Sequence, residues 1–167
     1  LYHVHPPTRV REVDVVRKVA IEYEEQEHLR HRHFRSAQVK PGGDAVGGRV
    51  PLMGNQEVVL YSVCPTEAMD YYYRFAHGDE TIFVHDGTGE LESQFGKLRY
   101  RPGDYLVIPT GVMYRIIPDD GVDQRFFVIE AFGHIEPPKR YLNRYGQFLE
   151  HSPYRERDIR PPEKLET

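Results

Sequence analysis

Short runs of apolar and β-branched residues, separated by Gly, Pro and Asp, fill the middle of the chain and predict strands. The run at 58–63, apolar except for Ser62, and the continuous apolar run at 105–108 predict buried strands, the second of them buried on both faces. Further strands are predicted at 71–75, 81–85, 90–94, 98–100, 113–117 and 125–129. Phe95-Gly96-Lys97 predicts the turn of a hairpin between the runs at 90–94 and 98–100. Many short strands at this spacing predict an all-β fold, a double-sheet barrel of the jelly-roll type.

The flanking segments are patterned less clearly. Five valines between residues 10 and 19 favour a strand because they are β-branched, and the basic stretch 28–40 is also typical of a strand. Paired glycines at 42–43 and 47–48 predict a flexible loop. From Pro137 onward, prolines interrupt a Tyr- and Arg-rich segment, which predicts an extended C-terminal arm. We therefore divide the chain into a barrel domain, residues 1–136, and an arm or linker, residues 137–167.

Composition and charge exclude several classes of function. The chain has 167 residues, 39% of them hydrophobic, which is enough to fold as one domain without disulfides. The lone Cys64 cannot form a disulfide within the chain, which fits a cytoplasmic protein. No apolar run approaches the ~18–20 residues of a membrane span, so no membrane association is expected. The net charge of −4 argues against a nucleic-acid partner. Because Leu1 is not an initiator Met, we expect a piece of a longer chain.

The glycine turn at 87–89, the hairpin, Gly103-Asp104 and Pro109-Thr-Gly111 follow one another at intervals that resemble the cupin barrel. Cupins hold a metal with two His and a Glu before this hairpin and a further His after the Pro-x-Gly.

Only one of these four positions holds the residue type with which cupins bind the metal. Glu80 stands at the Glu position, but Tyr73 and Phe75 stand at the first two His positions. Met113, with Tyr114 beside it, replaces the later His. Aromatic and thioether groups cannot replace imidazoles around a hard divalent ion. We therefore expect no catalytic residue and no metal ligand in this chain, and substrate-binding residues stay unassigned.

The remaining candidate residues give weaker signals. The pairs His3/His5 and His31/His33 each place two rings on one side of an extended chain, but no carboxylate lies at a fitting interval. A solvated basic face is the simpler interpretation. His85 precedes Asp-Gly and predicts a turn residue, while Cys64 at the end of an apolar strand is typical of an inert thiol. The sequence contains no Gly-x-Ser-x-Gly elbow and no phosphate-binding P-loop.

Three stretches together resemble one family, the bacterial type of homogentisate 1,2-dioxygenase. They are residues 1–8, residues 79–89 continuing to 103–109, and residues 145–154 with 157–162. Members resemble two tandem cupin halves and are more than twice this length. They cleave homogentisate with O2 to maleylacetoacetate, a step of tyrosine and phenylalanine breakdown. The ferrous ion, Fe(II), is held by two His and one Glu of the second half.

The resemblance implies that this chain is the N-terminal, non-metal-binding half of such an enzyme, with a structural and assembly role. Its implied partners are the absent C-terminal catalytic half and further copies of itself in a trimer or hexamer. Iron belongs to the parent family, and none is expected in this chain. Two alternatives stay open: a stand-alone non-catalytic cupin that binds a small aromatic acid, and a small metalloenzyme that uses His77 and Glu80.

Overall fold

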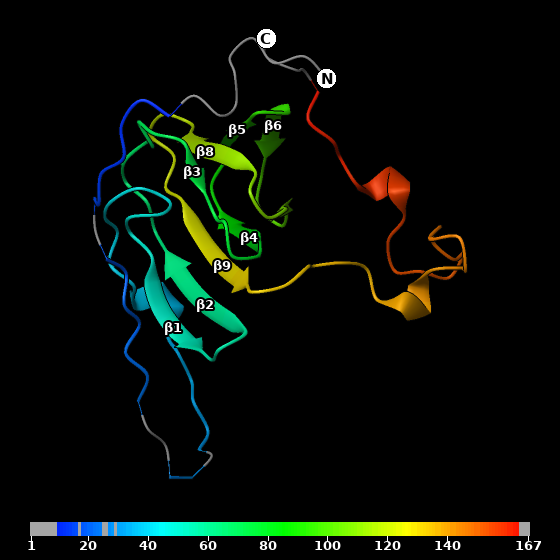
Figure 1. Ribbon diagram of the computed structural model, residues 1–167, viewed down its shortest axis with the longest axis horizontal. Coiled ribbons are helices and arrows are strands. Elements are labelled where there is room, and N and C mark those ends of the chain that lie inside the picture. Colours follow the sequence, from blue (N-terminus) through cyan, green and yellow to red (C-terminus); the bar gives the residue numbers. More distant parts are fainter. Residues whose placement is uncertain (1–9, 17, 25–26, 29, 164–167) are drawn as a thin grey trace.

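Figure 1 shows the computed structural model of the chain, which describes residues 10–16, 18–24, 27–28 and 30–163. The strands are β1 (Val50–Gly54), β2 (Val58–Val63), β3 (Tyr73–Arg74), β4 (Asp79–Asp86), β5 (Gly89–Ser93), β6 (Gly96–Tyr100), β7 (Tyr105–Ile108), β8 (Met113–Pro118) and β9 (Arg125–Ala131). Three 3-10 helices, η1 (Ser36–Gln38), η2 (Lys139–Tyr141) and η3 (Glu156–Asp158), span three residues each. No helix among the described residues has the length or apolar run that crossing a bilayer requires.

The strands form two antiparallel sheets that share one hydrophobic core. The five-stranded sheet has the order β1-β2-β9-β4-β7, and the four-stranded sheet has the order β3-β8-β5-β6. Along β9, Phe126, Val128 and Glu130 face inward and alternate with half-buried neighbours, as period-2 strand geometry requires. Ile116 of β8 belongs to the same core cluster as Val128, which joins the two sheets. This arrangement confirms the predicted all-β double-sheet fold.

The predicted hairpin is present as β5 and β6. Ser93 pairs with Gly96, and Gly96 has φ +113°, a backbone conformation that side chains with a Cβ rarely adopt. The Ser93 hydroxyl accepts a hydrogen bond from the Phe95 backbone N–H at 3.1 Å. The hairpin is confirmed, but its loop is Gln94-Phe95, one residue earlier than predicted, because Gly96 and Lys97 already pair within β6.

Strand β7 has the predicted boundaries, but the prediction that both of its faces are buried is wrong. Leu106 and Ile108 face the core, while Tyr105 and Val107 are 65% and 51% exposed. The reason is that β7 is the last strand of its sheet and carries no covering layer over these two side chains. His85 also differs from the prediction, because it lies within β4 and not in a turn.

The N-terminal predictions fail in three places. The described residues of 10–19 contain no strand, and η1 is the only helix or strand among the described residues of 28–40. Strand β1, which the sequence analysis missed, contains Pro51, a residue that argues against a central strand. Its place at the sheet edge and an irregular register between Pro51 and Met53 accommodate the proline.

The glycine-rich loop at 42–48 is a turn tied to the barrel. Asp44 Oδ1 accepts hydrogen bonds from the backbone N–H groups of Val46 and Gly47 at 2.7 and 2.6 Å. Ala45 and Val46 pack into the hydrophobic core. The turn therefore sets the position of the next side chains, including Arg49.

The arm leaves the barrel after β9 and its end returns beside β6 (Figure 1). Within it, the Phe148 and Tyr154 rings pack edge to face at 5.1 Å, and Leu142 pairs with Phe148 as an isolated bridge. The Glu163 backbone N–H donates to Lys97 O at 3.2 Å, which fastens the end of the arm to β6.

Asp79 joins the start of β4 to two neighbouring loops. Its Oδ1 accepts hydrogen bonds from the Thr110 backbone N–H and hydroxyl at 2.8 and 2.7 Å, and its Oδ2 accepts one from the Ile135 N–H at 2.7 Å. Burial by itself raises the pKa of Asp79, but these hydrogen bonds outweigh it and hold the pKa below its usual value. The ionised carboxylate thus stabilises the fold.

Replacing this carboxylate is expected to destabilise the barrel. Asp79→Ala should lower the free energy of unfolding at pH 7 by about 2–3 kcal/mol, because charge-assisted hydrogen bonds are lost and buried N–H groups are left unpaired. Since the folded-state pKa is lowered, this stabilisation is present above the ordinary value of 3.8 and is lost as the pH falls through the folded-state pKa. Urea unfolding at pH 7 and pH 3 measures both effects. The exposed Asp120→Ala variant is the control, and an equal loss in the two variants would contradict the assignment.

Candidate functional site

Arg49 extends from the glycine-rich turn into the space between the two sheets. Its Nε donates to Ala45 O at 3.0 Å, and its side chain is only 5% exposed. Because an unpaired charge in a core is costly, this guanidinium must find anionic partners there.

Two buried carboxylates supply them. Arg49 Nη2 pairs with Glu80 Oε1, and Arg49 Nη1 lies 2.8 Å from Glu130 Oε1. Glu80 comes from β4 and is fully buried, and Glu130 comes from β9. A single cation therefore lies between two anions in the barrel core.

Three tyrosines complete the arrangement. The Tyr114 hydroxyl donates to Glu80 Oε2 at 2.8 Å, and the Tyr61 hydroxyl donates to Glu130 Oε2 at 2.8 Å. The Tyr73 ring packs edge to face on Tyr114 at 5.7 Å, and the guanidinium carbon of Arg49 lies 5.5 Å from the Tyr73 centroid. This distance is typical of a cation–π contact. We call the six residues Arg49, Tyr61, Tyr73, Glu80, Tyr114 and Glu130 the core ion cluster.

Burial and charge shift the pKa values within the cluster. Burial raises the pKa of Glu80, and the Arg49 guanidinium opposes part of that rise. Burial also raises the pKa of Tyr73 to about 12 and raises the pKa of Tyr114 well above its usual value. For Arg49, burial lowers the pKa, but the acidic groups around it outweigh burial and keep the guanidinium charged. At neutral pH the tyrosines are hydrogen-bond donors and not bases.

The cluster lies at the positions where a cupin would hold its metal. Glu80, predicted at the Glu position, faces the interior, and Tyr73 is half-buried beside Tyr114. Of the two residues considered for the late His position, Tyr114 is fully buried, whereas Met113 is 43% exposed. Alternate residues of β8 face the core, so Tyr114 and not Met113 points into the interior. Phe75 is buried against other rings, with Phe132 at 5.9 Å.

These residues do not fit a ferrous ion. Within the described part of the chain, no three or more His, Cys, Asp or Glu side chains gather into a metal-binding group. The two carboxylates that could ligate a cation already share the Arg49 guanidinium, whose charge repels a second cation. Ferrous sites of the two-His, one-carboxylate type need imidazoles and open positions, and neither is available beside Glu80.

The other sequence candidates are not brought together. His77 is exposed and its ring contacts Phe75 at 6.0 Å, whereas Glu80 is fully buried, so the two do not form a site. His31 and His33 are exposed on the N-terminal segment. His3 and His5 lie outside the described residues. Cys64 is a buried free thiol directly after β2.

Sequence reasoning missed three members of the cluster, Arg49, Tyr61 and Glu130. Tyr61 lies in the predicted strand 58–63 but was not recognised as a site residue. Glu130 could have been found, because it continues the inward-facing alternation of Phe126 and Val128. Arg49 carries no such signal, because it precedes its strand and reaches the core only through the fold of the turn before it.

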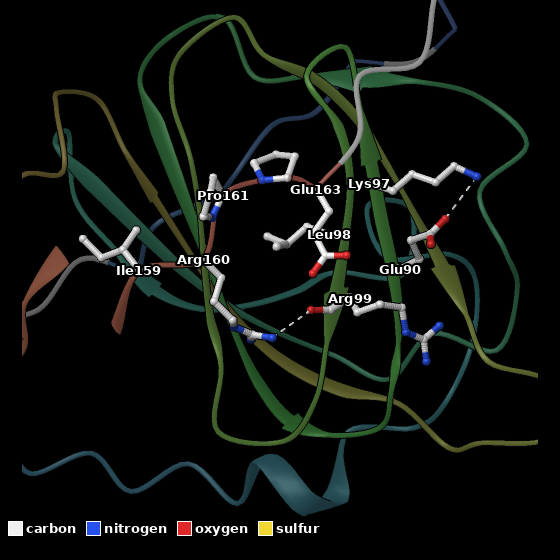
Figure 2. A pocket seen from close by; sticks show the side chains of 9 residues that line it. Glu90, Lys97, Leu98, Arg99, Ile159, Arg160, Pro161 and Glu163 are labelled. Carbon is white, nitrogen blue, oxygen red and sulfur yellow. Dashed lines mark hydrogen bonds and ion pairs between the residues drawn. The ribbon is translucent and has the colours of Figure 1, made fainter. Parts of the chain in front are cut away.

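An open groove of about 570 Å³ lies outside the barrel, between the end of the arm and β6. Figure 2 shows the residues that line it, among them Glu90, Lys97, Arg99, Ile159, Arg160 and Glu163. Lys97 pairs with Glu90 at 3.3 Å, and Arg160 pairs with Asp104. Two of its cations, Lys97 and Arg160, thus pair with carboxylates of the same chain.

The chain resembles known proteins over most of its length. The family model described as homogentisate 1,2-dioxygenase N-terminal matches residues 8–140. A provisionally named dioxygenase of Saccharolobus solfataricus is 34% identical over 163 residues, which are 97% of this chain and 42% of that protein. A homogentisate 1,2-dioxygenase of Emericella nidulans is 31% identical over 83 residues, which are 49% of this chain and 18% of that protein.

Solved structures resemble the barrel. A provisionally named mannose-6-phosphate isomerase of Ralstonia eutropha superposes with a TM-score of 0.50 at 19% identity, covering 60% of this chain and 98% of that one. A cupin protein of Bacteroides fragilis has a TM-score of 0.48 at 14% identity and covers 64% of this chain and 86% of that one. At these identities the likeness concerns the fold alone.

The chain spans less than half the length of the curated relatives it matches. The family match nevertheless extends over the whole barrel, from before β1 to past β9. The chain is a dioxygenase-like cupin, and it belongs to the family of homogentisate 1,2-dioxygenase N-terminal domains.

Proposed function

We propose that this chain is the non-metal-binding N-terminal half of a cytoplasmic, homogentisate 1,2-dioxygenase-like ring-cleaving enzyme, and that its role there is structural. The observation that carries the proposal is the core ion cluster, in which Arg49 lies between Glu80 and Glu130. The family match and the shorter length relative to the relatives support the assignment to one half of a longer enzyme.

The chemistry of ring cleavage explains why this half has no catalytic part. A metal that activates both an aromatic diol-like substrate and O2 needs protein ligands on one side and open positions on the other. Here the interior is occupied by a guanidinium and by tyrosine side chains that are hydrogen-bonded to the carboxylates. Fe(II) and its ligands therefore belong to the second half in this proposal.

The arm fits a role in holding the two halves together. Tyr145, Leu149 and Tyr154 are 71%, 40% and 36% exposed, while Tyr141 and Phe148 are half-buried. Such a concentration of aromatic residues is unusual for a free linker, since disordered segments are normally poor in them. In the proposed enzyme these side chains pack against the second half, and the barrel supports a trimeric or hexameric assembly.

The alternative of a stand-alone cupin that binds a small aromatic acid has no comparable support. Tyr61, Tyr100 and Tyr114 are buried within the described barrel and fill the space that such a ligand would need. The groove beside β6 lies outside the barrel, where the end of the arm lies against β6.

Removing the central cation is expected to destabilise the barrel strongly. Arg49→Met should lower the free energy of unfolding at neutral pH by about 3–5 kcal/mol, because two buried carboxylates are left without a partner. The loss should shrink near pH 5, since the folded-state pKa of Glu80 is raised and protonation at low pH removes its uncompensated charge. Denaturant unfolding at both pH values measures the change. The matched control is Arg74→Met at an exposed position of β3, and a loss in Arg49→Met that is independent of pH would contradict this account.

Metal analysis tests the non-catalytic assignment directly. We expect the chain, purified after growth with added iron, to hold far less than one iron per chain. With homogentisate, ferrous iron and O2 it should form no more ring-cleaved product than a protein-free control. One tightly held iron or manganese per chain that Glu80→Gln abolishes would overturn the proposal.

The longer protein supplies the complementary test. The proposal requires a reading frame that continues past Thr167 into a second cupin half. Its product should bind iron and cleave homogentisate, and its iron content should be unaffected by Glu80→Gln. A stop codon directly after Thr167 would favour a stand-alone protein.

A further inference from the structure

We propose that the end of the arm, residues 159–163, is a reversible strap over the edge of β6, which polar contacts hold closed and which opens while the barrel stays folded. We call these residues the edge strap. The inference goes beyond the proposed function and does not depend on it, because it concerns contacts within this chain alone.

The edge strap lies along β6, the last strand of the four-stranded sheet. The Glu163 backbone N–H donates to Lys97 O at 3.2 Å. Three residues earlier in the strap, Arg160 Nη1 lies 3.4 Å from Arg99 O (Figure 2), and Arg160 Nη2 pairs with Asp104. Residue numbers rise along the strap as they fall along β6, so the strap runs antiparallel to the strand.

A proline prevents the strap from completing a regular strand pair. With Glu163 opposite Lys97, antiparallel pairing places Pro161 opposite Arg99, where the next backbone hydrogen bonds would form. Proline has no N–H to donate there. The Arg160 side chain donates to Arg99 O instead, at a distance longer than that of a good hydrogen bond. Among the described residues, one backbone hydrogen bond therefore joins the strap to β6.

Little apolar contact holds the strap in place. Ile159 is 54% exposed, Arg160 and Pro161 are also exposed, and Pro162 is half-buried. The open groove of about 570 Å³ lies between the strap and β6, so the two do not pack tightly. The side chains of the Arg160–Asp104 ion pair are 48% and 18% exposed, and such pairs contribute little and are weakened by salt. Opening the strap should therefore cost far less than unfolding the barrel.

Strand β6 keeps its place in the sheet without the strap. Its register with β5 is regular from Gly89–Tyr100 to Ser93–Gly96. On its outer face Lys97 pairs with Glu90 at 3.3 Å, and Arg99 pairs with Asp119 at 2.6 Å. Opening thus uncovers an intact edge, and an uncovered edge is a template for a further strand. The strap switches β6 between a covered and an uncovered state.

Amide hydrogen exchange, measured by NMR on the whole chain, tests whether the strap opens by itself. The Glu163 amide should exchange at a rate that low concentrations of urea do not change, because opening exposes little surface. The amides of β9, a central strand of its sheet, should exchange far more slowly and should respond to urea. If the Glu163 amide exchanges as slowly as those of β9 and with the same urea dependence, the strap opens only when the barrel unfolds, and the proposal is overturned.

The ion pair is tested by removing its cation. Arg160→Met should raise the exchange rate of the Glu163 amide by about two- to fivefold. An increase from about 0.05 to about 0.5 M NaCl should act in the same direction on the unmodified chain, and much less on Arg160→Met. Arg157→Met, at a position of the same arm that is 77% exposed, is the control. Equal rates in the two variants would contradict the proposal.

A substitution that closes the strap more tightly is the sharper test. Pro161→Val restores a backbone N–H opposite Arg99 and should lower the exchange rate of the Glu163 amide by about two- to tenfold. Pro153→Val removes an exposed proline elsewhere in the arm and should leave the rate unchanged. An unchanged or faster rate in Pro161→Val would overturn the proposal, because the strap would then not be an antiparallel partner of β6.

Discussion

The pairing of Arg49 with Glu80 and Glu130 inside the barrel is the interaction on which the rest of the structure depends. Each carboxylate oxygen has a partner: Arg49 for one oxygen of each, Tyr114 for the other oxygen of Glu80, and Tyr61 for that of Glu130. Hydrogen bonds to the remaining polar atoms help a buried ion pair to stabilise a fold; here three of the four carboxylate oxygens accept one, and Glu80 Oε1 has the ion pair with Arg49 alone. This network joins β2, β4, β8 and β9, so it links both sheets.

The same interaction compensates the charge of a carboxylate that faces the interior of the barrel. In a cupin, a cation compensates the inward-facing carboxylate. Here the guanidinium supplies positive charge beside Glu80 from within the chain, and the phenols supply the hydrogen bonds. In the proposed function the interior serves stability, and the contacts with other parts of the enzyme are made by surfaces outside it. The exposed aromatic residues of the arm and the apolar outer face of β7 are such surfaces.

The edge strands of the two sheets differ in how they are protected against pairing with a further strand. β1 uses a proline and an irregular register, and β6 uses the end of the arm, so that neither presents a free row of backbone groups. β7 is an edge strand with neither protection.

The sequence by itself determined the fold class and most of the strands. Period-2 patterns, β-branched runs and the Gly96 turn are local signals, and they placed β2 and β7 at their observed boundaries. Local signals failed where the outcome depends on partners. The valines of 10–19 have strand propensity but do not pair with either described sheet. β1 was not predicted because it contains Pro51, a residue that a strand tolerates only at a sheet edge.

Only the tertiary structure decided which charged side chains pair with one another in the core. The sequence showed that Glu80 occupies a ligand position and that imidazoles are missing around it, but not what compensates its charge. Arg49 and Glu80 are 31 positions apart, and Glu80 and Glu130 are 50 apart. No local pattern in a single sequence predicts these contacts, because they result from the turn at Asp44 and from the packing of the two sheets. Burial then made the pairing obligatory, since an unpaired charge cannot remain in a hydrophobic core.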